Sequence, residues 1–447
     1  LKIQGGLIMV RDMTQGNVTR HLLTYAVPLM FANLLQQLYQ TVDSIIVGQY
    51  NGKEALAAIG AAGPIMNILI FLIVGLSLGA SILMSEYFGA KDYKALKTEM
   101  ATSLVSGFIL TIVLSLLAFT GSGLFIRMTR TPLEIAPMAS QYLKIISLGL
   151  IFTFFYNILS AGLRSIGDSR APLYVLCLTT ILHVLLAVYM VGTLHMGVQG
   201  AAYATVISQA VSSLMLFIYI KVKVPYLRLS LPELHIDMDF LKKTVDFSSI
   251  SALQQTVLYI GRLLVQSGIN TLGVDAVAAF NAVSIIDSYV LAPGDSLAAS
   301  ITTFTAQNKG GKQYHRIPKG LKTVIVMAEI YTIAISVLVL AGKNQLLGIF
   351  LKPEETEALR FGIFYIIPMA CFYFLSGITN SFQGYFRGIG NLRVTLIATI
   401  IQIPIRVILT YSLLGRFGIQ AVVIGTTIGW CCMTVYELVS YRKWRFS

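Results

Sequence analysis

The most constraining feature of this sequence is a succession of long apolar runs separated by short polar segments. A helix needs about 20 mainly apolar residues to cross the hydrocarbon core of a bilayer. Twelve runs reach that length, at residues 22–48, 55–85, 100–126, 139–163, 171–194, 197–220, 247–272, 276–305, 323–342, 361–386, 394–414 and 417–440. The pattern predicts an all-α membrane protein with twelve transmembrane helices.

The composition excludes a water-soluble fold. Of the 447 residues, 56% are hydrophobic and only 12% are charged, whereas soluble domains carry about 25% charged residues. The formal net charge of +13 would suggest a nucleic-acid partner in a soluble protein. In a membrane protein the same excess usually holds cytoplasmic loops on the inside, so the position of the charges decides between the two interpretations.

Lys and Arg are distributed unequally between the two sides. With the N-terminus inside, 23 of the 33 Lys and Arg residues fall in inner segments and 7 fall in outer loops. The positive-inside rule therefore predicts that both termini are cytoplasmic. The bias accounts for most of the net charge, so no nucleic-acid partner is expected. We expect a multi-pass protein of the plasma membrane, with the lipid bilayer as its surroundings.

Two further predictions concern the cysteines and the first residues of the chain. Cys177, Cys371, Cys431 and Cys432 lie in apolar runs without the spacing of a metal site, so we predict small core residues, no disulfide framework, no metal and no cofactor. The chain opens at Leu1, and the segment from Met13 leads into the first apolar run. We expect residues 1–12 to contribute nothing to function.

A polar segment divides the chain into halves of six spans each. It contains two prolines and mixed charge, which is typical of a surface linker. The predicted organisation is a cytoplasmic tail at 1–20, an N-lobe at 21–223, a cytoplasmic linker at 224–243, a C-lobe at 244–440 and a cytoplasmic tail at 441–447.

The two halves repeat each other in sequence. The matched segments are 52–59 (GKEALAAI) with 273–280 (GVDAVAAF), 89–93 (GAKDY) with 310–314 (GGKQY), 164–170 (RSIGDSR) with 387–393 (RGIGNLR), and 197–199 (GVQ) with 418–420 (GIQ). Because six spans is an even number, both halves insert with the same orientation. An axis along the membrane normal should relate them, with a cavity between them near the midplane. This arrangement predicts an alternating-access transporter.

These residues resemble the multidrug and toxic compound extrusion (MATE) family. The likeness runs from about residue 14 to 440, and its motifs stand at 26–29 (AVPL), 41–48 (TVDSIIVG), 52–58 (GKEALAA) and 163–168 (LRSIGD). The resemblance implies a secondary antiporter that exports organic compounds against an inward flow of protons or sodium. It implies a transporter of small molecules and no enzyme, and we expect a monomer.

The sequence departs from both branches of that family at the positions that couple ions. One branch pairs the acid of the first span with an Asn…Leu-Asp element in span five. Here His183 stands in place of the Asn, and Ala187 in place of the Asp. The other branch carries acids in spans seven and ten, where this chain has Gln255 and Ser376. Of the two sets, the chain keeps Asp43.

Ionisable side chains inside the spans need a reason, because each costs about 2.5–3.5 kcal/mol at the centre of a membrane helix. Asp43 lies roughly 12 Å below the outer surface, at about 1.5 Å per residue, and is predicted to couple ions; the alternative is a structural cap. Arg262 is predicted to form a gating or ion pair with Asp43 or with Asp287. His183 and Arg406 occupy equivalent positions in the two halves. His183 either carries protons, because its side chain titrates nearest pH 7, or is a buried hydrogen-bonded residue.

Uncharged polar and aromatic residues form the predicted substrate site. Its members are Gln36, Tyr39, Gln40, Phe154, Asn157, Gln254, Gln255, Tyr259 and Asn380. Aromatic faces with a few polar anchors are the usual composition of small-molecule sites. Together with a carboxylate they suit lipophilic cations through stacking and cation–π attraction. The alternative for any single Gln or Asn is a hydrogen bond that holds helices together.

The coupling ion is predicted to be the proton rather than sodium. Sodium, a hard cation, needs several oxygen ligands in fixed geometry, whereas a proton needs one carboxylate. A phosphate-binding loop with a Gly-Lys-Ser/Thr ending is missing from the sequence, so the chain does not hydrolyse ATP itself. A lipid-linked saccharide flippase of the same superfamily is the alternative function. A channel or scaffold would not need two matched halves.

Overall fold

The computed structural model describes residues 10–129 and 131–445, without the side chains of Gln40, Lys53, Trp444 and Arg445. The described residues form long helices joined by short turns and contain no strand. Most of residues 1–12, which were expected to contribute nothing to function, lie outside the described residues. Within it, the backbone N–H of Arg11 donates to the carbonyl of Ile166 at 3.0 Å, so this short segment packs on the turn that follows α3.

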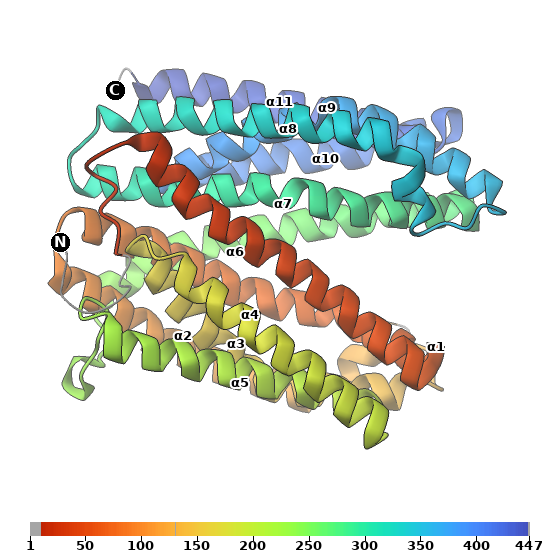
Figure 1. Ribbon diagram of the computed structural model, residues 1–447, viewed down its shortest axis with the longest axis horizontal. Coiled ribbons are helices and arrows are strands. Elements are labelled where there is room, and N and C mark those ends of the chain that lie inside the picture. The colour runs from red at the N-terminus through yellow and green to blue at the C-terminus, as the bar shows by residue number, and fades with distance from the viewer. Residues whose placement is uncertain (1–9, 130, 446–447) are drawn as a thin grey trace. The chain divides into compact units, whose positions relative to one another are not determined.

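The helices gather into two compact units, and the first is built from the N-terminal half. It comprises residues 10–15, 27–252 and 309–312. Its helices are most of α1 (Val18–Gly89), α2 (Tyr93–Met128), α3 (Ala136–Ser165), α4 (Arg170–Ala187), α5 (Gly197–Lys223) and the start of α6 (Met238–Ile269). α3 packs against both α2 and α5 (Figure 1). Ile73, Phe154 and Leu216 belong to the apolar core that joins α1, α3 and α5.

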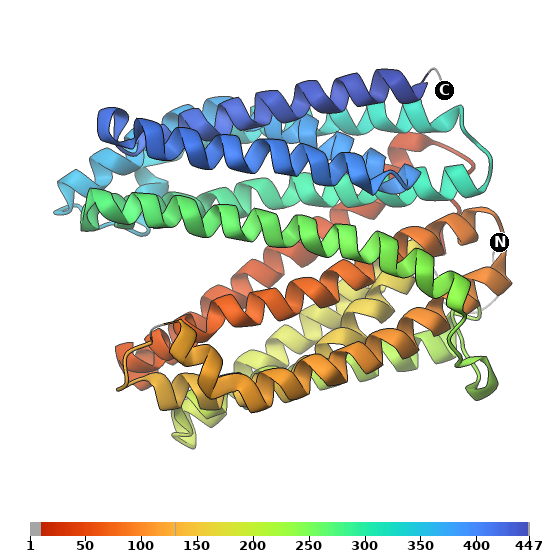
Figure 2. The ribbon, with the colours of Figure 1, turned by 180° about the vertical axis from the view of Figure 1, so that it is seen from behind.

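The second unit comprises residues 16–26, 253–308 and 313–445. It holds the rest of α6 and the helices α7 (Val274–Gly310), α8 (Arg316–Gly348), α9 (Thr356–Ile389), α10 (Leu392–Phe417) and α11 (Gln420–Arg445). α10 and α11 run side by side, as do α8 and α9 (Figure 2). Val283, Ile366 and Val422 belong to the apolar core of this unit, which is a separate cluster from that of the first.

The backbone carries the same repeat as the sequence. Four pairs of residues in matched positions all have positive φ angles, which L-residues other than glycine rarely adopt. The pairs are Gly52 (76°) and Gly273 (98°), Lys91 (59°) and Lys312 (55°), Gly167 (84°) and Gly390 (89°), and Gly197 (60°) and Gly418 (55°). Gly52 breaks α1 into two helices, so the described chain has twelve long helical segments in two repeated sets. The predicted fold class is confirmed.

Ten helical segments of the described chain are long and apolar enough to cross a membrane. The two other long segments are the part of α1 before Gly52 and α6. They open the first and the second half of the repeat, and they contain several of the predicted site residues. Their polar content therefore distinguishes them from the helices whose side chains are mostly apolar.

The segment between the halves is held to α2. The backbone N–H and the hydroxyl of Ser230 donate to Glu233 Oε2 at 2.7 and 2.8 Å, and Lys97 Nζ lies 3.1 Å from Glu233 Oε1. These hydrogen bonds, the backbone one first, lower the pKa of Glu233 from 4.5 to about 2. Because the folded pKa is depressed, the carboxylate stabilises this turn above pH 4.5 and loses that effect as the pH falls through about 2.

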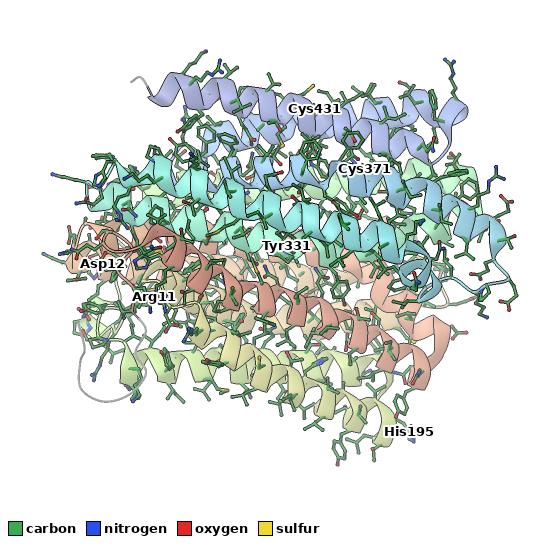
Figure 3. All side chains as sticks on the ribbon, turned by 45° about the horizontal axis from the view of Figure 1, so that its top comes forward. Arg11, Asp12, His195, Tyr331, Cys371 and Cys431 are labelled. Atoms are coloured by element: carbon green, nitrogen blue, oxygen red, sulfur yellow. The ribbon has the colours of Figure 1, made fainter. Side chains whose placement is uncertain are left out.

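The prediction for the cysteines was wrong in part. All four thiols are free, as expected, but none is fully buried. Cys371 and Cys431 are exposed on the outer faces of α9 and α11 (Figure 3). The physical reason is that a membrane helix is apolar on its lipid-facing side as well as on its packed side, so an apolar run does not identify the core.

We predict that Gly384→Ala destabilises the second unit by about 1–3 kcal/mol, the usual cost of overpacking a tight contact. A Cβ at Gly384 in α9 would stand 2.3 Å from the carbonyl oxygen of Ala298 in α7. Gly342→Ala in α8 is the control, because its Cβ would meet nothing within 4 Å. Thermal unfolding in detergent measures both, and an equal response of the two variants would contradict the prediction.

Candidate functional site

The two residues predicted to couple ions meet in the first unit. Asp43, on the part of α1 before Gly52, lies 3.5 Å from His183 of α4, measured from Oδ1 to Nε2. The His183 side chain is fully buried and that of Asp43 is 17% exposed. Because both groups titrate and both are largely out of solvent, the charge of each depends on the protonation of the other.

Two hydroxyl groups complete this cluster. Thr205 Oγ1 of α5 lies 3.4 Å from His183 Nε2, and the Tyr39 hydroxyl donates to Thr205 Oγ1 at 3.5 Å. The Tyr39 and His183 rings are tilted by 40° with centroids 4.2 Å apart. Asp43 Oδ1 and His183 Nδ1 have no hydrogen-bond partner among the described residues. The cluster therefore keeps free capacity to bind a proton.

The local sequence explains why these side chains converge. Ile46 and Val47 of α1 pack with Ala187 and Val191 in an apolar cluster beside the pair. Ala187 lies one turn after His183. Because its side chain is small, α1 and α4 can approach each other closely at this point. Directly after α4, the chain continues as a π-helical turn, Val188–Thr193, a feature that occurs frequently at functional sites.

The second unit contains another acid among basic groups. Asp287 of α7 accepts a short hydrogen bond from the hydroxyl of Tyr373 in α9. The guanidinium groups of Arg406 in α10 and Arg262 in α6 attract its carboxylate electrostatically. In the described part of the chain, however, no direct ion pair joins them to Asp287. Arg262 is exposed and Arg406 is half-buried. The three predicted gating or ion-pair residues thus surround one site.

The residues predicted to bind substrate are divided between the two units. Tyr39 lies at the Asp43 pair, and Asn380 donates to Asp295 Oδ1 at 3.2 Å. Gln254 is buried and donates to Gln383 Oε1 at 2.8 Å and to Thr399 Oγ1 at 3.0 Å.

The other residues predicted to bind substrate differ in burial and in local contacts. Gln36 is exposed, whereas Gln255 and Tyr259 are half-buried. Asn157 donates to the carbonyl of Thr153 in its own helix at 2.8 Å. Phe154 is fully buried in the core of the first unit. Gln40 is also a member of the predicted set, but its side chain is not among those that the structure describes.

Two acids that the sequence reasoning did not weigh lie inside the spans. Asp295 follows Pro293 in α7 and accepts from Asn380, and Glu437 is fully buried in α11. Glu437 is the single acid of the run 417–440, and Asp295 shares the run 276–305 with Asp287. Because a charge in a membrane helix is costly, an acid in an apolar run is a sequence signal for such a site. No group of three His, Cys, Asp or Glu residues that could hold a metal occurs in the described residues.

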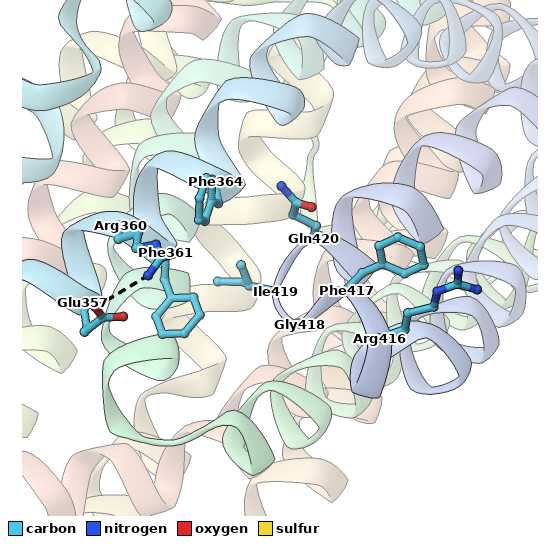
Figure 4. A pocket seen from close by; sticks show the side chains of 9 residues that line it. All are labelled: Glu357, Arg360, Phe361, Phe364, Arg416, Phe417, Gly418, Ile419 and Gln420. Atoms are coloured by element: carbon cyan, nitrogen blue, oxygen red, sulfur yellow. Dashed lines mark ion pairs between the residues drawn. The ribbon is translucent and has the colours of Figure 1, made fainter.

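A pocket of about 420 Å³ lies elsewhere in the second unit. It is lined by Glu357, Arg360, Phe361 and Phe364 of α9 and by residues 416–420 at the turn between α10 and α11 (Figure 4). Arg360 and Glu357 form an ion pair at 3.8 Å. The pocket includes none of the predicted site residues, so it does not define the site.

Comparisons with known proteins agree on one family. The MatE family model matches residues 28–189 and 251–412, once in each half. The "Probable multidrug resistance protein YpnP" of Bacillus subtilis (strain 168) is 29% identical over 393 residues, covering 88% of this chain and 87% of its own. The "Multidrug export protein MepA" of Staphylococcus saprophyticus is 22% identical, covering 92% and 90% of the two chains.

Solved structures show the same fold. The "Outward-facing conformation of a multidrug resistance MATE family transporter of the MOP superfamily" covers 98% of each chain with a TM-score of 0.91 and 23% identity. These likenesses place the chain among multi-pass membrane transporters of small molecules. It belongs to the MatE family of multidrug efflux transporters, whose members are not enzymes.

We predict that Tyr373→Phe lowers the stability of the protein by about 1.5–3 kcal/mol, the contribution of a hydrogen bond to a charged group. The variant removes the one hydroxyl that donates to Asp287 and leaves the ring in place. Tyr385→Phe on the same helix is the control, because no hydrogen bond of its hydroxyl to a described residue is found. Thermal unfolding in detergent compares them; equal melting temperatures would refute the prediction.

Proposed function

We propose that this protein exports lipophilic, cationic organic compounds in exchange for protons, by alternating access. The observation that carries the proposal is the Asp43–His183 pair, 3.5 Å apart and largely buried. A carboxylate in such surroundings can hold either a proton or an organic cation, but not both. That exclusion is the simplest physical basis for exchange.

The cycle follows from the charge of Asp43. When the site faces the cytoplasm, Asp43 is ionised and attracts a cationic substrate. When the site faces outside, a proton binds Asp43, removes its charge and releases the cation. The protonated, neutral site then returns, because a neutral carboxyl costs less to bury than a carboxylate. His183 Nε2 lies 3.5 Å from Asp43 Oδ1, so a small movement would bring the imidazole into hydrogen-bonding contact with the carboxyl group.

The donor set around Asp43 supports protons over sodium. The polar groups of the cluster beside Asp43 are an imidazole nitrogen and two hydroxyls: Thr205 Oγ1 lies 3.4 Å from His183 Nε2, and the Tyr39 hydroxyl donates to Thr205. A hard cation such as sodium binds through several oxygen ligands, usually including carboxylates. Ala187, one turn after His183, contributes no oxygen from its side chain.

The substrate class rests on chemistry at the same place. The Tyr39 ring packs against the His183 ring, and His183 Nε2 lies 3.5 Å from Asp43 Oδ1. Aromatic rings near a carboxylate suit a flat cation. The names of the relatives, which refer to multidrug resistance and multidrug export, point in the same direction. They do not favour a lipid-linked saccharide flippase. We keep Gln36, Gln40, Gln255, Tyr259 and Asn380 as further proposed contacts of the substrate.

We predict that Asp43→Asn abolishes proton-driven efflux while the protein still folds and inserts, because the change removes a buried charge and adds none. The measurement is efflux of the planar cation ethidium from reconstituted vesicles, driven by a pH step at zero voltage. The rate should fall to that of vesicles without protein.

Asp239→Asn is the matched control, since its side chain is exposed and, among the described residues, makes only a 3.8 Å pair with Lys242. It should export ethidium like the unmodified protein. Efflux that responds to a sodium gradient alone and ignores the pH step would rule out the proton mechanism. Full activity of Asp43→Asn would instead make Asp43 a structural residue.

We also propose that the protein is a monomer of the plasma membrane with both termini in the cytoplasm. The distribution of Lys and Arg supports this orientation. The turns at Lys91 and Lys312, which share a positive φ, would then both be cytoplasmic.

We predict that cysteines replacing Tyr93 and Tyr314 are labelled only from the cytoplasmic side. Both side chains are exposed, at 37% and 61%, so a reagent can reach them. The four native cysteines are first replaced by Ala. Glu354→Cys, in the exposed loop before α9, is the control and should be labelled only from outside. Labelling of position 93 or 314 by an impermeant external reagent would overturn the topology.

A further inference from the structure

Glu437 is a buried acid that the proposed cycle does not use. It lies in α11, eight residues before Arg445 and therefore roughly 12 Å from the end of that helix at about 1.5 Å per residue. Its side chain is 0% exposed. An ionisable group in a membrane helix is costly, so its presence in an apolar run calls for a role.

Side chains from four helices form a connected network around it. Gln383 Nε2 of α9 donates to Glu437 Oε1 at 2.6 Å, and Gln383 Oε1 accepts from Gln254 Nε2 of α6 at 2.8 Å. Gln254 Nε2 also donates to Thr399 Oγ1 of α10 at 3.0 Å. Arg387 Nη2 of α9 donates to Gln254 Oε1 at 3.3 Å. All of these residues belong to the second unit.

Two complementary atoms of this network are unsatisfied. Glu437 Oε2 and Arg387 Nε are buried and have no hydrogen-bond partner in the described part of the chain. One is an acceptor and the other is a donor, and the two side chains attract each other electrostatically. Leaving a buried polar atom unpaired costs about 1–3 kcal/mol. A second arrangement, in which Arg387 Nε–H donates to Glu437 Oε2, would satisfy both atoms.

The charges of the cluster do not balance without a proton. Arg387 interacts with two carboxylates, Asp295 and Glu437. One guanidinium and two carboxylates leave a single negative charge in excess. Asp295 is exposed and accepts a hydrogen bond from Asn380. Glu437 has no contact with solvent and is the group that a proton would neutralise.

The surroundings of Glu437 contain few other titratable groups. From α9 it faces Arg387. The rings of Tyr385 and Tyr441, about one turn away, meet edge to face with centroids 5.4 Å apart. The residues that α6 and α10 contribute to the network, Gln254, Thr395 and Thr399, do not titrate.

We propose that Glu437 is a second proton-binding site, whose proton is exchanged during each transport cycle in addition to that of Asp43. When Glu437 gives its proton to cytoplasmic water, its Oε2 accepts the Arg387 Nε–H. When a proton binds Glu437 again, Arg387 keeps its hydrogen bond to Gln254 and its electrostatic attraction to Asp295, as in the present structure. This inference rests on the proposed proton exchange and adds one proton to its stoichiometry.

The test is the largest ethidium ratio that a fixed pH difference can sustain across reconstituted vesicles held at zero voltage. Each proton exchanged per substrate multiplies this ratio by about ten for every pH unit. Glu437→Gln should therefore lower the limiting ratio about tenfold at a difference of one pH unit. The measured quantity is the final ethidium ratio, so a variant that transports more slowly but with the same stoichiometry reaches the same value. An unchanged limit in Glu437→Gln would overturn the proposal.

Three further variants make the result specific. Glu437→Asp keeps the acid and should hold the unmodified limit. Glu437→Met fills a similar volume without a titratable group, replaces the Gln variant if that one does not fold, and should give the same tenfold decrease. Glu99→Gln removes the equally buried acid of α2 in the first unit and should leave the limit unchanged; a matching decrease there would also contradict the proposal. If the unmodified protein sustains no ratio at all, the proposed proton exchange itself fails.

Discussion

The interior of a bilayer offers no water to backbone or side-chain polar groups, so each must find its partner within the protein. Most hydroxyls in the described helices meet this requirement locally: Thr111, Ser147 and Thr426 each donate to the carbonyl four residues before them. The polar groups that bond between helices are therefore the informative ones. Several of them involve ionisable groups, among them Glu99 in the first unit and Asp287, Asp295 and Glu437 in the second.

Each half of the repeat places a base at the same position and an acid at a different one. His183 in α4 and Arg406 in α10 are equivalent by the repeat, whereas Asp43 is on α1 and Asp287 is on α7. The imidazole of His183 can exist in a neutral or a protonated form, whereas the guanidinium of Arg406 stays charged. Both members of the Asp43–His183 pair in the first unit are therefore groups that can exchange a proton. Asp287, with a permanent cation nearby and a hydrogen bond from Tyr373, is better suited to a fixed interaction.

The sequence was sufficient for the fold because its signals are local. Run length predicts the membrane helices, and the repeated Gly and Lys positions coincide with the positive φ angles that end or break them. The sequence left Asp43 and Asp287 open as the partner of Arg262, and within the second unit Arg262 and Arg406 both attract Asp287. It was not sufficient for the network of Gln254, whose partners come from distant parts of the chain. The faces of α9 and α11 that carry Cys371 and Cys431 could not be assigned from apolar content either.

The two most polar long helices have a common place in the duplicated architecture. The part of α1 before Gly52 carries Tyr39 and Asp43, and α6 carries Gln254 and Arg262. A helix with such side chains is costly to expose to lipid, because its polar face needs protein or water beside it. Each half thus begins with a helix whose stability depends on its neighbours more than on the bilayer. A helix of that kind needs protein or water beside its polar face in every conformation, which suits the proposed role of Tyr39 and Asp43 as binding groups.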